Sequence, residues 1–278
     1  SLSARQVSLI LLDMFTASIV IPCFNEEKTL RQTVARLQEI VDDTLQLEIL
    51  IVDDCSSDRS LEIALELETE FSEVRSLHHQ VNQGKGAALR TGFQKAIGDA
   101  VAVQDADLEY DPHDLRRLIQ LIQDDKADVA LGSRFLTGGP HRVLYFWHSV
   151  GNNFLTFLSN MMTDLNLTDM ETCYKVFRKE VLEGIVIKED RFGFEPEIVA
   201  KVARQNVRIF EMGISYSGRT YEEGKKIGMK DGFRAIYCIL RYNLGHLPLG
   251  MKMFLFGTLA MVAGAVVAVV YFLRMAAG

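Results

Sequence analysis

The chain has 278 residues, a formal net charge of −7 at pH 7 and a hydrophobic fraction of 48%. This length suits one large domain or two small ones, and the negative charge argues against a nucleic-acid partner. The four cysteines contain no CxxC pair and no zinc-ligand spacing, so we expect free thiols in a reducing compartment rather than disulfides. They are Cys23, Cys55, Cys173 and Cys238.

One apolar run near the C-terminus accounts for the high hydrophobic fraction. Residues 253–273 contain no charged side chain. Because about 20 apolar residues cross a bilayer core, the run predicts a single transmembrane helix within residues 249–278. The alternative is a buried core helix. Ala260, Gly264 and Ala268 recur every four residues, a spacing that either supports a homo-oligomer or simply faces lipid.

The segment before this run is amphipathic and basic. Residues 229–248 place several apolar side chains on one helical face, which predicts a juxtamembrane helix lying in the membrane interface. Packing of this face on the catalytic domain is the alternative. The apolar residues are Phe233, Ile236, Tyr237, Leu240 and Leu244. Basic residues far outnumber the one acid, Asp231, which indicates a cytoplasmic face. They are Lys225, Lys226, Lys230, Arg234, Arg241 and Lys252.

Strand and helix patterns alternate after a lead-in, residues 1–16, that carries no clear signal. Buried-strand runs are expected at residues 18–21, 48–52, 74–77, 100–103 and 128–131. Helices are expected at 30–41, 59–70, within 84–97, and from the capping pair Asp111-Pro112 to about residue 122. The alternation predicts an α/β domain over residues 17–228 with a mostly parallel sheet and flanking helices.

Three of these strands end in polar clusters, which we expect on one rim, because ligands bind outside the carboxyl ends of such strands. The clusters are Asn25-Glu26-Glu27, Asp53-Asp54 and Asp105-Ala106-Asp107. Asp105 and Asp107 suit Mg²⁺ or Mn²⁺, with phosphate oxygens and water completing the shell, and Glu109 is a third candidate at the same spacing. The alternative is a capping and turn cluster.

The remaining rim residues suit a nucleotide. Asp53 and Asp54 can accept hydrogen bonds from a base and a ribose, and Asn25 and Glu26 could line the same pocket. The alternative for Glu26 and Glu27 is a first-turn pair that complements the helix dipole. The sequence QGKG at residues 83–86 lacks phosphate-loop spacing, so Lys85 either approaches the nucleotide or remains a solvated loop lysine.

The chain resembles the family 2 inverting glycosyltransferases, in particular the dolichol-phosphate mannose synthase type. The resemblance covers residues 17–230 and implies a GT-A fold, a GDP- or UDP-sugar donor, and a polyprenyl or dolichyl phosphate acceptor. The segments that carry it are IVIPCFNE (19–26), IVDDCSSD (51–58), DADLE (105–109) and GSR (132–134). The segment 167–175 is similar to the acceptor-side segment of the same subgroup.

The resemblance also implies roles for single residues. Pro22, Asn25, Glu26 and Asp54 fall at the nucleotide, together with Asp105 and Ala106. Asp105, Asp107 and Glu109 fall at the metal, although many members have Gln at the last position. Arg134 falls at the acceptor phosphate, with His148 or Arg142 as the second contact and Asn152 beside them. Arg219 and the pair Lys225-Lys226 resemble a late basic motif that closes over the diphosphate; a headgroup contact is the alternative for the lysines.

We therefore expect a metal-dependent, inverting transfer of a hexose to a polyprenyl phosphate at the cytoplasmic membrane face, with mannose from GDP-mannose as the first candidate. The acceptor phosphate is mostly a dianion at neutral pH, so a general base is less necessary. The expected catalytic residues are Asp107, Arg134, Arg219, Lys225 and Lys226. Glu195 and Glu197 either bind sugar hydroxyls or act as first-turn acids.

Three alternatives remain open. One is a polyprenyl-phosphate glucosyltransferase that uses UDP-glucose. Another is a processive polysaccharide synthase, which would need more spanning helices than the single predicted one. The last, from a different class, is a nucleotide-binding scaffold with an inactive site, against which the intact pair Asp105 and Asp107 argues.

Overall fold

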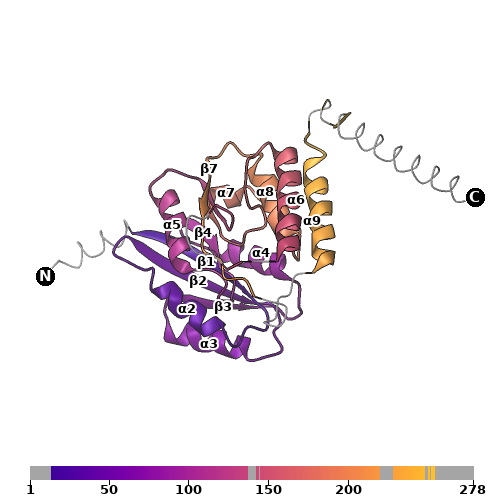
Figure 1. Cartoon of the computed structure of the whole chain (residues 1–278). Coiled ribbons are helices and arrows are strands. Elements are labelled where there is room, and N and C mark those ends of the chain that lie inside the picture. The colour runs from indigo at the N-terminus through magenta and orange to yellow at the C-terminus, as the bar shows by residue number, and fades with distance from the viewer. Residues whose placement is uncertain are drawn as a thin grey trace, which may run out of the picture.

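A seven-stranded sheet with the order β3-β2-β1-β4-β6-β5-β7 organises the chain (Figure 1). The structure is a computed structural model that describes residues 14–136, 142–143, 145–219, 228–247, 250 and 252–253. The strands are β1 (Phe15–Cys23), β2 (Leu45–Asp53), β3 (Val74–His78), β4 (Ala100–Val103), β5 (Val129–Ser133), β6 (Lys175–Arg178) and β7 (Ile209–Gly213). The helices are α2 (Leu30–Gln38), α3 (Ser60–Glu70), α4 (Lys85–Lys95), α5 (Pro112–Gln123), α6 (Phe146–Thr163), α7 (Lys179–Glu183), α8 (Phe194–Val202) and α9 (Met229–Asn243).

The strand directions confirm the predicted α/β fold with a mostly parallel sheet. β1 pairs in parallel with both β2 and β4, and β5 pairs in parallel with β7. β6 runs antiparallel to its two neighbours, β4 and β5. All five predicted strands are present, whereas β6 and β7 were not predicted. β6 has only four residues, and a lysine and an arginine at its two ends hide the apolar pattern.

Apolar residues bury both faces of the central strands. The neighbouring pairs Ile19-Val20 and Ile49-Leu50 point to opposite faces and are all 0% exposed, and each such side chain contributes about 1.5–3 kcal/mol relative to an exposed one. In Figure 1, α2 and α3 lie together below the sheet, while α6, α8 and α9 lie side by side at its far end. This layering leaves the carboxyl edge of β1, β2 and β4 accessible to the loops that follow these strands.

The helix predicted before the apolar run is present as α9, but its apolar residues are divided between two environments. Leu240 and Leu244 of the predicted face are half-buried and pack against the core, whereas the buried Ala235, Cys238 and Ile239 were not assigned to that face. Phe233 and Tyr237 remain exposed, at 68% and 47%. Packing on the domain, the alternative given for this helix, therefore accounts for part of the predicted face.

The membrane-spanning prediction falls almost entirely outside the described residues. Among the helices that the structure does describe, none combines the length and the apolar composition needed to cross a bilayer. Of the run at 253–273, the structure describes Met253 alone. The span and the oligomer contacts assigned to Ala260, Gly264 and Ala268 remain predictions. The same holds for Lys225 and Lys226, which also lie outside the described residues.

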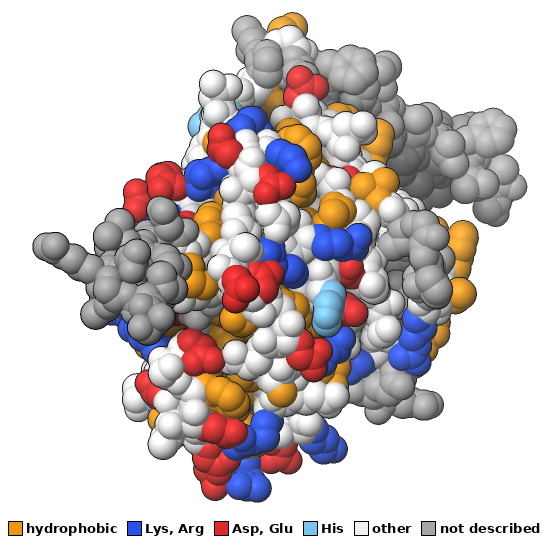
Figure 2. All heavy atoms as spheres, turned by 90° about the vertical axis from the view of Figure 1, so that its left-hand side faces the viewer, with side chains coloured by type: hydrophobic (Ala, Val, Ile, Leu, Met, Phe, Trp, Pro, Cys, Tyr) orange, Lys and Arg blue, Asp and Glu red, His pale blue; other side chains and the backbone are white. Residues whose placement is uncertain are grey.

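The surface carries mixed charge. Figure 2 shows the left-hand side of Figure 1, where acidic and basic side chains alternate without a large area of one sign. Ion pairs such as Arg31–Glu66 at 2.5 Å and Arg59–Glu62 at 2.8 Å are exposed, so solvent screens them and they contribute little to stability. The stability of the fold therefore depends on the buried apolar layers rather than on these pairs.

Candidate functional site

The loops after β1 and β2 meet at the carboxyl edge of the sheet, as the polar clusters predicted. The parallel register places Cys23 opposite Asp53, so both loops leave the sheet at the same level. Side-chain bonds then join the loops: Ser57 N donates to Asn25 Oδ1 at 2.8 Å, and Arg59 N donates to Glu27 Oε2 at 3.1 Å. Asn25 and Glu27 thus act as loop caps in this structure.

A cavity of about 330 Å³ opens at this edge. It brings together nine of the residues predicted for the site: Pro22, Glu26, Asp54, Lys85, Asp105, Ala106, Asp107, Glu109 and Arg219. Asn25 and Asp53 do not line it. The Asp53 side chain is fully buried and accepts hydrogen bonds from Ser56 N and from His78 Nδ1, both at 3.1 Å. The cavity wall also includes Phe24, Asn82, Arg191, Phe192 and Tyr216, which were not predicted.

Asp54 positions the loop that carries Lys85. Its carboxylate accepts from Gln83 N at 2.9 Å and Gly84 N at 2.6 Å, and contacts His79 Nδ1 at 2.7 Å. Gly84 has φ +103°, and a Cβ there would lie 2.4 Å from Asp190 O, so only glycine fits this turn. The turn starts α4 and directs Lys85 toward the cavity, which removes the alternative of a solvated loop lysine.

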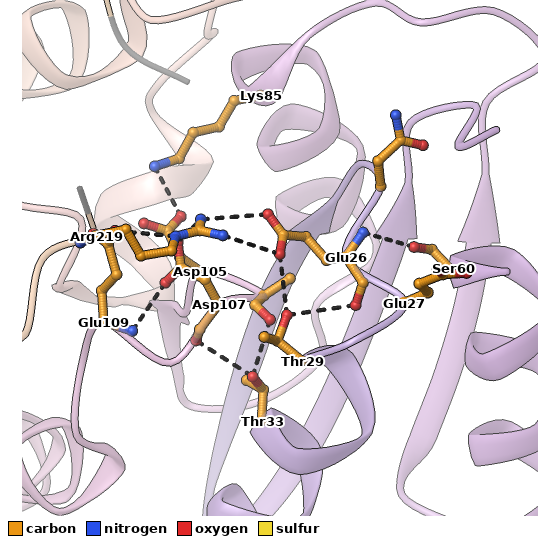
Figure 3. A network of polar contacts seen from close by, with 12 residues as sticks. Glu26, Glu27, Thr29, Thr33, Ser60, Lys85, Asp105, Asp107, Glu109 and Arg219 are labelled. Carbon is orange, nitrogen blue, oxygen red and sulfur yellow. Dashed lines mark hydrogen bonds and ion pairs between the residues drawn. The ribbon is translucent and has the colours of Figure 1, made fainter. Parts of the chain in front are cut away.

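The acidic residues of the cavity are paired with basic side chains (Figure 3). Lys85 Nζ lies 2.9 Å from Asp105 Oδ1. Arg219 lies between the loops after β1 and β4: its Nη2 is 2.5 Å from Asp107 Oδ2, its Nε is 3.2 Å from Glu109 Oε1, and the guanidinium is 3.4 Å from Glu26. The site is therefore an anionic cluster that already binds two cationic groups.

Burial and neighbouring charges move the pKa values of the two aspartates in opposite directions. Burial raises the pKa of Asp105, but the charge of Lys85 and its hydrogen bond outweigh this and hold the pKa below its ordinary value. Burial, and then the charges of Asp105 and Glu109, raise the pKa of Asp107 to about 7, against the opposing effect of Arg219. The loop after β4 thus concentrates negative charge that cations stabilise.

The predicted three-carboxylate metal site is not assembled. Across the described ranges, no group of three or more His, Cys, Asp and Glu side chains is arranged to hold a metal ion. Both carboxylate oxygens of Glu109 are engaged, one by the Tyr216 hydroxyl at 2.7 Å and the other by Arg219 N at 2.8 Å. The assignment of Glu109 as a third ligand is therefore not supported. Asp105 and Asp107 remain a pair of hard oxygen donors, which fits an ion that takes most of its ligands from phosphate and water.

A second cavity of about 550 Å³ adjoins the first one. The two share the wall residues Lys85, Asp105, Glu109, Phe192 and Tyr216. Arg134, His148 and Asn152, three of the four residues predicted for the acceptor, line the second cavity. Arg142 does not line it, and its Nη1 donates to Gly218 O at 2.8 Å. The predicted donor and acceptor residues therefore fall into two cavities that meet at the pair Lys85–Asp105.

Arg134 is held by an acidic partner that was not singled out in the sequence. Its Nε and Nη2 donate to the fully buried Asp169 at 2.6 and 2.7 Å, and Nη2 also donates to Asn152 Oδ1 at 3.0 Å. Burial lowers the pKa of Arg134, but Asp169 outweighs it, so the guanidinium stays charged. Tyr216 stacks on it at 5.2 Å. These contacts fix its orientation and leave Nη1 as the nitrogen that Asp169 and Asn152 do not use.

The two glutamates at the start of α8 have different roles. Glu197 is fully buried, accepts from Lys188 N at 2.8 Å and Glu189 N at 2.7 Å, and pairs with Lys201. It is therefore a structural first-turn acid. Glu195 lines the second cavity, with its Oε1 3.4 Å from Lys85 Nζ. The sequence Glu195-Pro196-Glu197 cannot distinguish these two roles, because it does not show which of the two glutamates the loop at Lys188 and Glu189 covers.

The family of this chain follows from its similarity to known proteins. Residues 18–186 match the family described as glycosyl transferase family 2. The chain belongs to this family, which confirms the class inferred from the four segments.

Two similar proteins carry specific names. A dolichol-phosphate mannosyltransferase of Pyrococcus furiosus is 29% identical over 230 residues, which are 81% of this chain and 64% of that protein. An undecaprenyl-phosphate mannosyltransferase of Micrococcus luteus is 29% identical over 237 residues, 81% of this chain and 93% of that protein. The match thus spans less than two thirds of the first relative and nearly all of the second.

The fold is also shared with solved structures. A glucosyl-3-phosphoglycerate synthase of Mycobacterium tuberculosis, solved in complex with Mn²⁺, uridine diphosphate and glucosyl-3-phosphoglycerate, superposes with a TM-score of 0.63. The alignment covers 90% of this chain and 87% of that chain at 16% identity. This similarity supports the GT-A-like arrangement of the sheet and helices.

Proposed function

We propose that this protein transfers a hexose from a nucleoside-diphosphate sugar to a polyprenyl phosphate, with inversion at the anomeric carbon. The observation that carries the proposal is the meeting of two cavities at Lys85 and Asp105. A two-substrate transfer needs such adjacent sites, one for the leaving diphosphate and one for the attacking phosphate. The names of the two mannosyltransferase relatives support the same substrate classes.

The first cavity is the proposed donor site. Asp105 and Asp107 would hold Mg²⁺ or Mn²⁺, and the ion would neutralise the leaving diphosphate as a Lewis acid. The Mn²⁺ and uridine diphosphate bound by the M. tuberculosis synthase support divalent-metal dependence in general. Lys85 and Arg219, already at the cavity wall, would bind phosphate oxygens with charge-assisted hydrogen bonds.

The second cavity is the proposed acceptor site. Arg134 is held rigidly by Asp169 and would bind the acceptor phosphate through Nη1, with His148 as a second contact. Because Asp169 neutralises Arg134, a second cation would strengthen phosphate binding. Lys225 and Lys226 are retained as candidates for that role. Most of the phosphate is a dianion at neutral pH, so it can attack without a general base.

An exposed apolar face supports attachment to a membrane. Helix α6 begins beside the second cavity and exposes a row of large apolar side chains: Phe146 (69%), Trp147 (78%), Val150 (40%), Phe154 (53%) and Phe157 (66%). The adjacent helix α9 also exposes two large apolar side chains, Phe233 and Tyr237. Soluble surfaces rarely expose apolar side chains in one such row. The proposal places this face on the cytoplasmic surface of a bilayer, where a polyprenyl phosphate would enter the second cavity.

The sugar is proposed to be mannose, because both relatives described above are named mannosyltransferases. GDP is proposed as its carrier on the family resemblance of the sequence. Glucose carried by UDP is the second candidate, since the M. tuberculosis synthase binds uridine diphosphate.

The proposal is tested by incubating the full chain in membranes with a polyprenyl phosphate, Mg²⁺ or Mn²⁺, and labelled GDP-mannose or UDP-glucose in parallel. We expect one donor to label a lipid that releases its sugar in mild acid. Label in a growing polysaccharide would indicate the processive synthase instead. If no donor labels any lipid or polymer, the proposed function is wrong and the nucleotide-binding scaffold is favoured.

A further inference from the structure

Two acidic side chains in the second cavity have no part in binding either phosphate group. Glu195 begins α8 and is 5% exposed, and Glu171 lies in the loop before β6. Glu195 Oε2 and Glu171 Oε1 are both buried and have no hydrogen-bond partner within the described chain. A buried oxygen of this kind destabilises the fold unless a ligand or water supplies a hydrogen bond to it. Both residues line the cavity, so a ligand there can supply the missing partners.

The two carboxyl groups offer complementary hydrogen bonds. Burial, and then the charge of Glu195, raise the pKa of Glu171 to about 8. At neutral pH Glu171 is thus mostly protonated and can donate a hydrogen bond as well as accept one. Glu195, whose Oε1 lies 3.4 Å from Lys85 Nζ, offers acceptor oxygens. A hydroxyl group both donates and accepts, so it can satisfy either partner.

The side chain of Lys175 holds the loop that carries Glu171. Lys175 is fully buried, and its Nζ donates to Met170 O at 3.0 Å and to Thr172 O at 2.5 Å. These two bonds hold the backbone on both sides of Glu171. A side chain on such a support is positioned before a ligand arrives, which favours a specific contact.

Glu171 and Glu195 lie between the residues proposed for the leaving diphosphate and those proposed for the attacking phosphate. Glu195 is one side chain away from Asp105, because Lys85 contacts both residues. Glu171 interacts electrostatically with Arg134, the proposed acceptor-phosphate contact. In a direct displacement, the transferred group lies between the leaving diphosphate and the attacking phosphate. That group is the hexose.

Charge excludes the other occupants. An acceptor phosphate would be repelled by the negative charge of Glu195, whereas Arg134 offers it a cationic contact in the same cavity. A metal ion is disfavoured by the buried Lys175 ammonium, whose charge acts on both glutamates. We propose that Glu171 and Glu195 form the subsite that binds hydroxyl groups of the transferred hexose and helps to select the sugar. This inference rests on the transfer reaction proposed above.

The test compares Glu171→Leu, which removes both hydrogen-bonding atoms, and Glu195→Gln with a control, Glu180→Gln, on the exposed surface of α7. Transfer is measured with GDP-mannose and UDP-glucose, and equilibrium binding is measured with both donors and with GDP and UDP alone. For the donor that the protein uses, we expect kcat/KM to fall about tenfold to 100-fold in the two cavity variants. The affinity for the matching nucleoside diphosphate should stay within about twofold of the wild type, because that ligand has no sugar.

A second measurement does not depend on the folding of any variant. Wild-type protein is assayed with deoxy analogues of its donor, each lacking one hydroxyl. The analogue that lacks the contacted hydroxyl should lose a similar factor in kcat/KM. The inference is overturned if no deoxy analogue loses activity, if both variants transfer at the wild-type rate, or if sugar donor and diphosphate affinity fall together.

The outcomes also separate this inference from the proposed function. If wild-type protein transfers neither sugar, the proposed function fails. The binding measurements then still test the subsite: Glu171→Leu and Glu195→Gln should each narrow the affinity difference between a nucleotide sugar and its diphosphate. If wild-type protein transfers sugar and the variants behave like Glu180→Gln, the subsite alone is wrong.

Discussion

Asp107 combines three features of a metal-binding carboxylate in this cavity. It lies close to Asp105 and Glu109, it is 9% exposed, and its negative charge is balanced by Arg219 at 2.5 Å. Burial removes a carboxylate from water, so a bound cation stabilises its negative charge. The single residue therefore contributes charge that an amide of the same shape cannot replace.

Replacing Asp107 with Asn should lower the rate of sugar transfer about 100-fold to 1,000-fold, because the metal and the leaving group lose a charged contact. The thermal unfolding temperature should change little, since the variant removes a carboxylate that its neighbours repel. Transfer to a prenyl phosphate is the measurement. Asp111→Asn is the control, because Asn caps α5 about as well as Asp. Full activity in Asp107→Asn would contradict the metal assignment.

The pKa of Glu171 determines how its contribution to the stability of the fold depends on pH. Its pKa, raised to about 8 by burial and by Glu195 and Asp169 against Lys175 and Arg134, lies above the unfolded value of 4.5. The contribution of the Glu171 carboxyl group to the free energy of unfolding is therefore fully present below pH 4.5. It is lost as pH rises toward 8, where the folded protein must ionise a buried group.

Glu171→Gln should consequently be more stable than the wild type at pH 8, by about 1–3 kcal/mol, and close to it at pH 5. Thermal unfolding of both proteins in the same detergent at the two pH values measures the difference. Equal melting temperatures at both values would show that the carboxyl group is not buried as described.

At the scale of elements, the start of α4 depends on two glycines that allow a loop to approach. A Cβ on Gly86 would lie 2.2 Å from Glu189 O and 3.0 Å from Arg191 O. The neighbours are backbone atoms, so they cannot move aside as a flexible side chain would. This contact holds the segment before α8 against the helix that carries Lys85.

Gly86→Ala should therefore destabilise the fold by about 1–3 kcal/mol. It should also lower the rate of sugar transfer, because the displaced helix start moves Lys85. Gly151→Ala on α6 is the matched control, because a Cβ there meets nothing within 4 Å. It should be neutral or stabilise by about 0.5–1 kcal/mol, since alanine favours a helix over glycine. Chemical denaturation of the two variants gives both values, and an unchanged Gly86→Ala would refute the close contact.

At the scale of the whole molecule, the two cavities and the apolar face of α6 are parts of one arrangement. His148 and Asn152 of α6 line the second cavity, whereas Phe154 and Phe157 of the same helix are exposed. One helix therefore connects the proposed acceptor site to the proposed membrane surface. A water-insoluble acceptor would reach Arg134 without leaving the bilayer.

Trp147 provides a direct probe, because it is the single tryptophan of the chain and is 78% exposed. Adding vesicles that contain anionic lipid should shift its fluorescence emission to shorter wavelength, as the indole enters the interface. Phe154→Ser should reduce the shift, while Leu65→Ser, an exposed apolar residue of α3, should not. An emission spectrum that stays unchanged with vesicles would exclude α6 from the membrane surface.

Local pattern was sufficient for the elements from β1 to β5 and for much of the donor site. Buried apolar runs such as residues 18–21 form strands wherever both faces are covered, and Asp111-Pro112 starts a helix by its own chemistry. β6 escaped prediction because it has four residues and runs antiparallel between two other strands, a pairing made by distant segments. The same limit applies to α6, whose exposed apolar face departs from the usual pattern of a surface helix.

The sequence by itself determined the α/β class, the family and the acidic loop after β4, because these depend on short segments whose chemistry is local. Tertiary structure alone decided which residues share a cavity. It assigned Asn25, Asp53 and Glu197 to structural contacts, engaged Glu109 with Tyr216 and Arg219, and paired Arg134 with Asp169. Glu171 and Glu195 became neighbours only when the loop before β6 packed against α8. The physical reason is that burial and partner choice arise between segments far apart in the chain, so no local pattern encodes them.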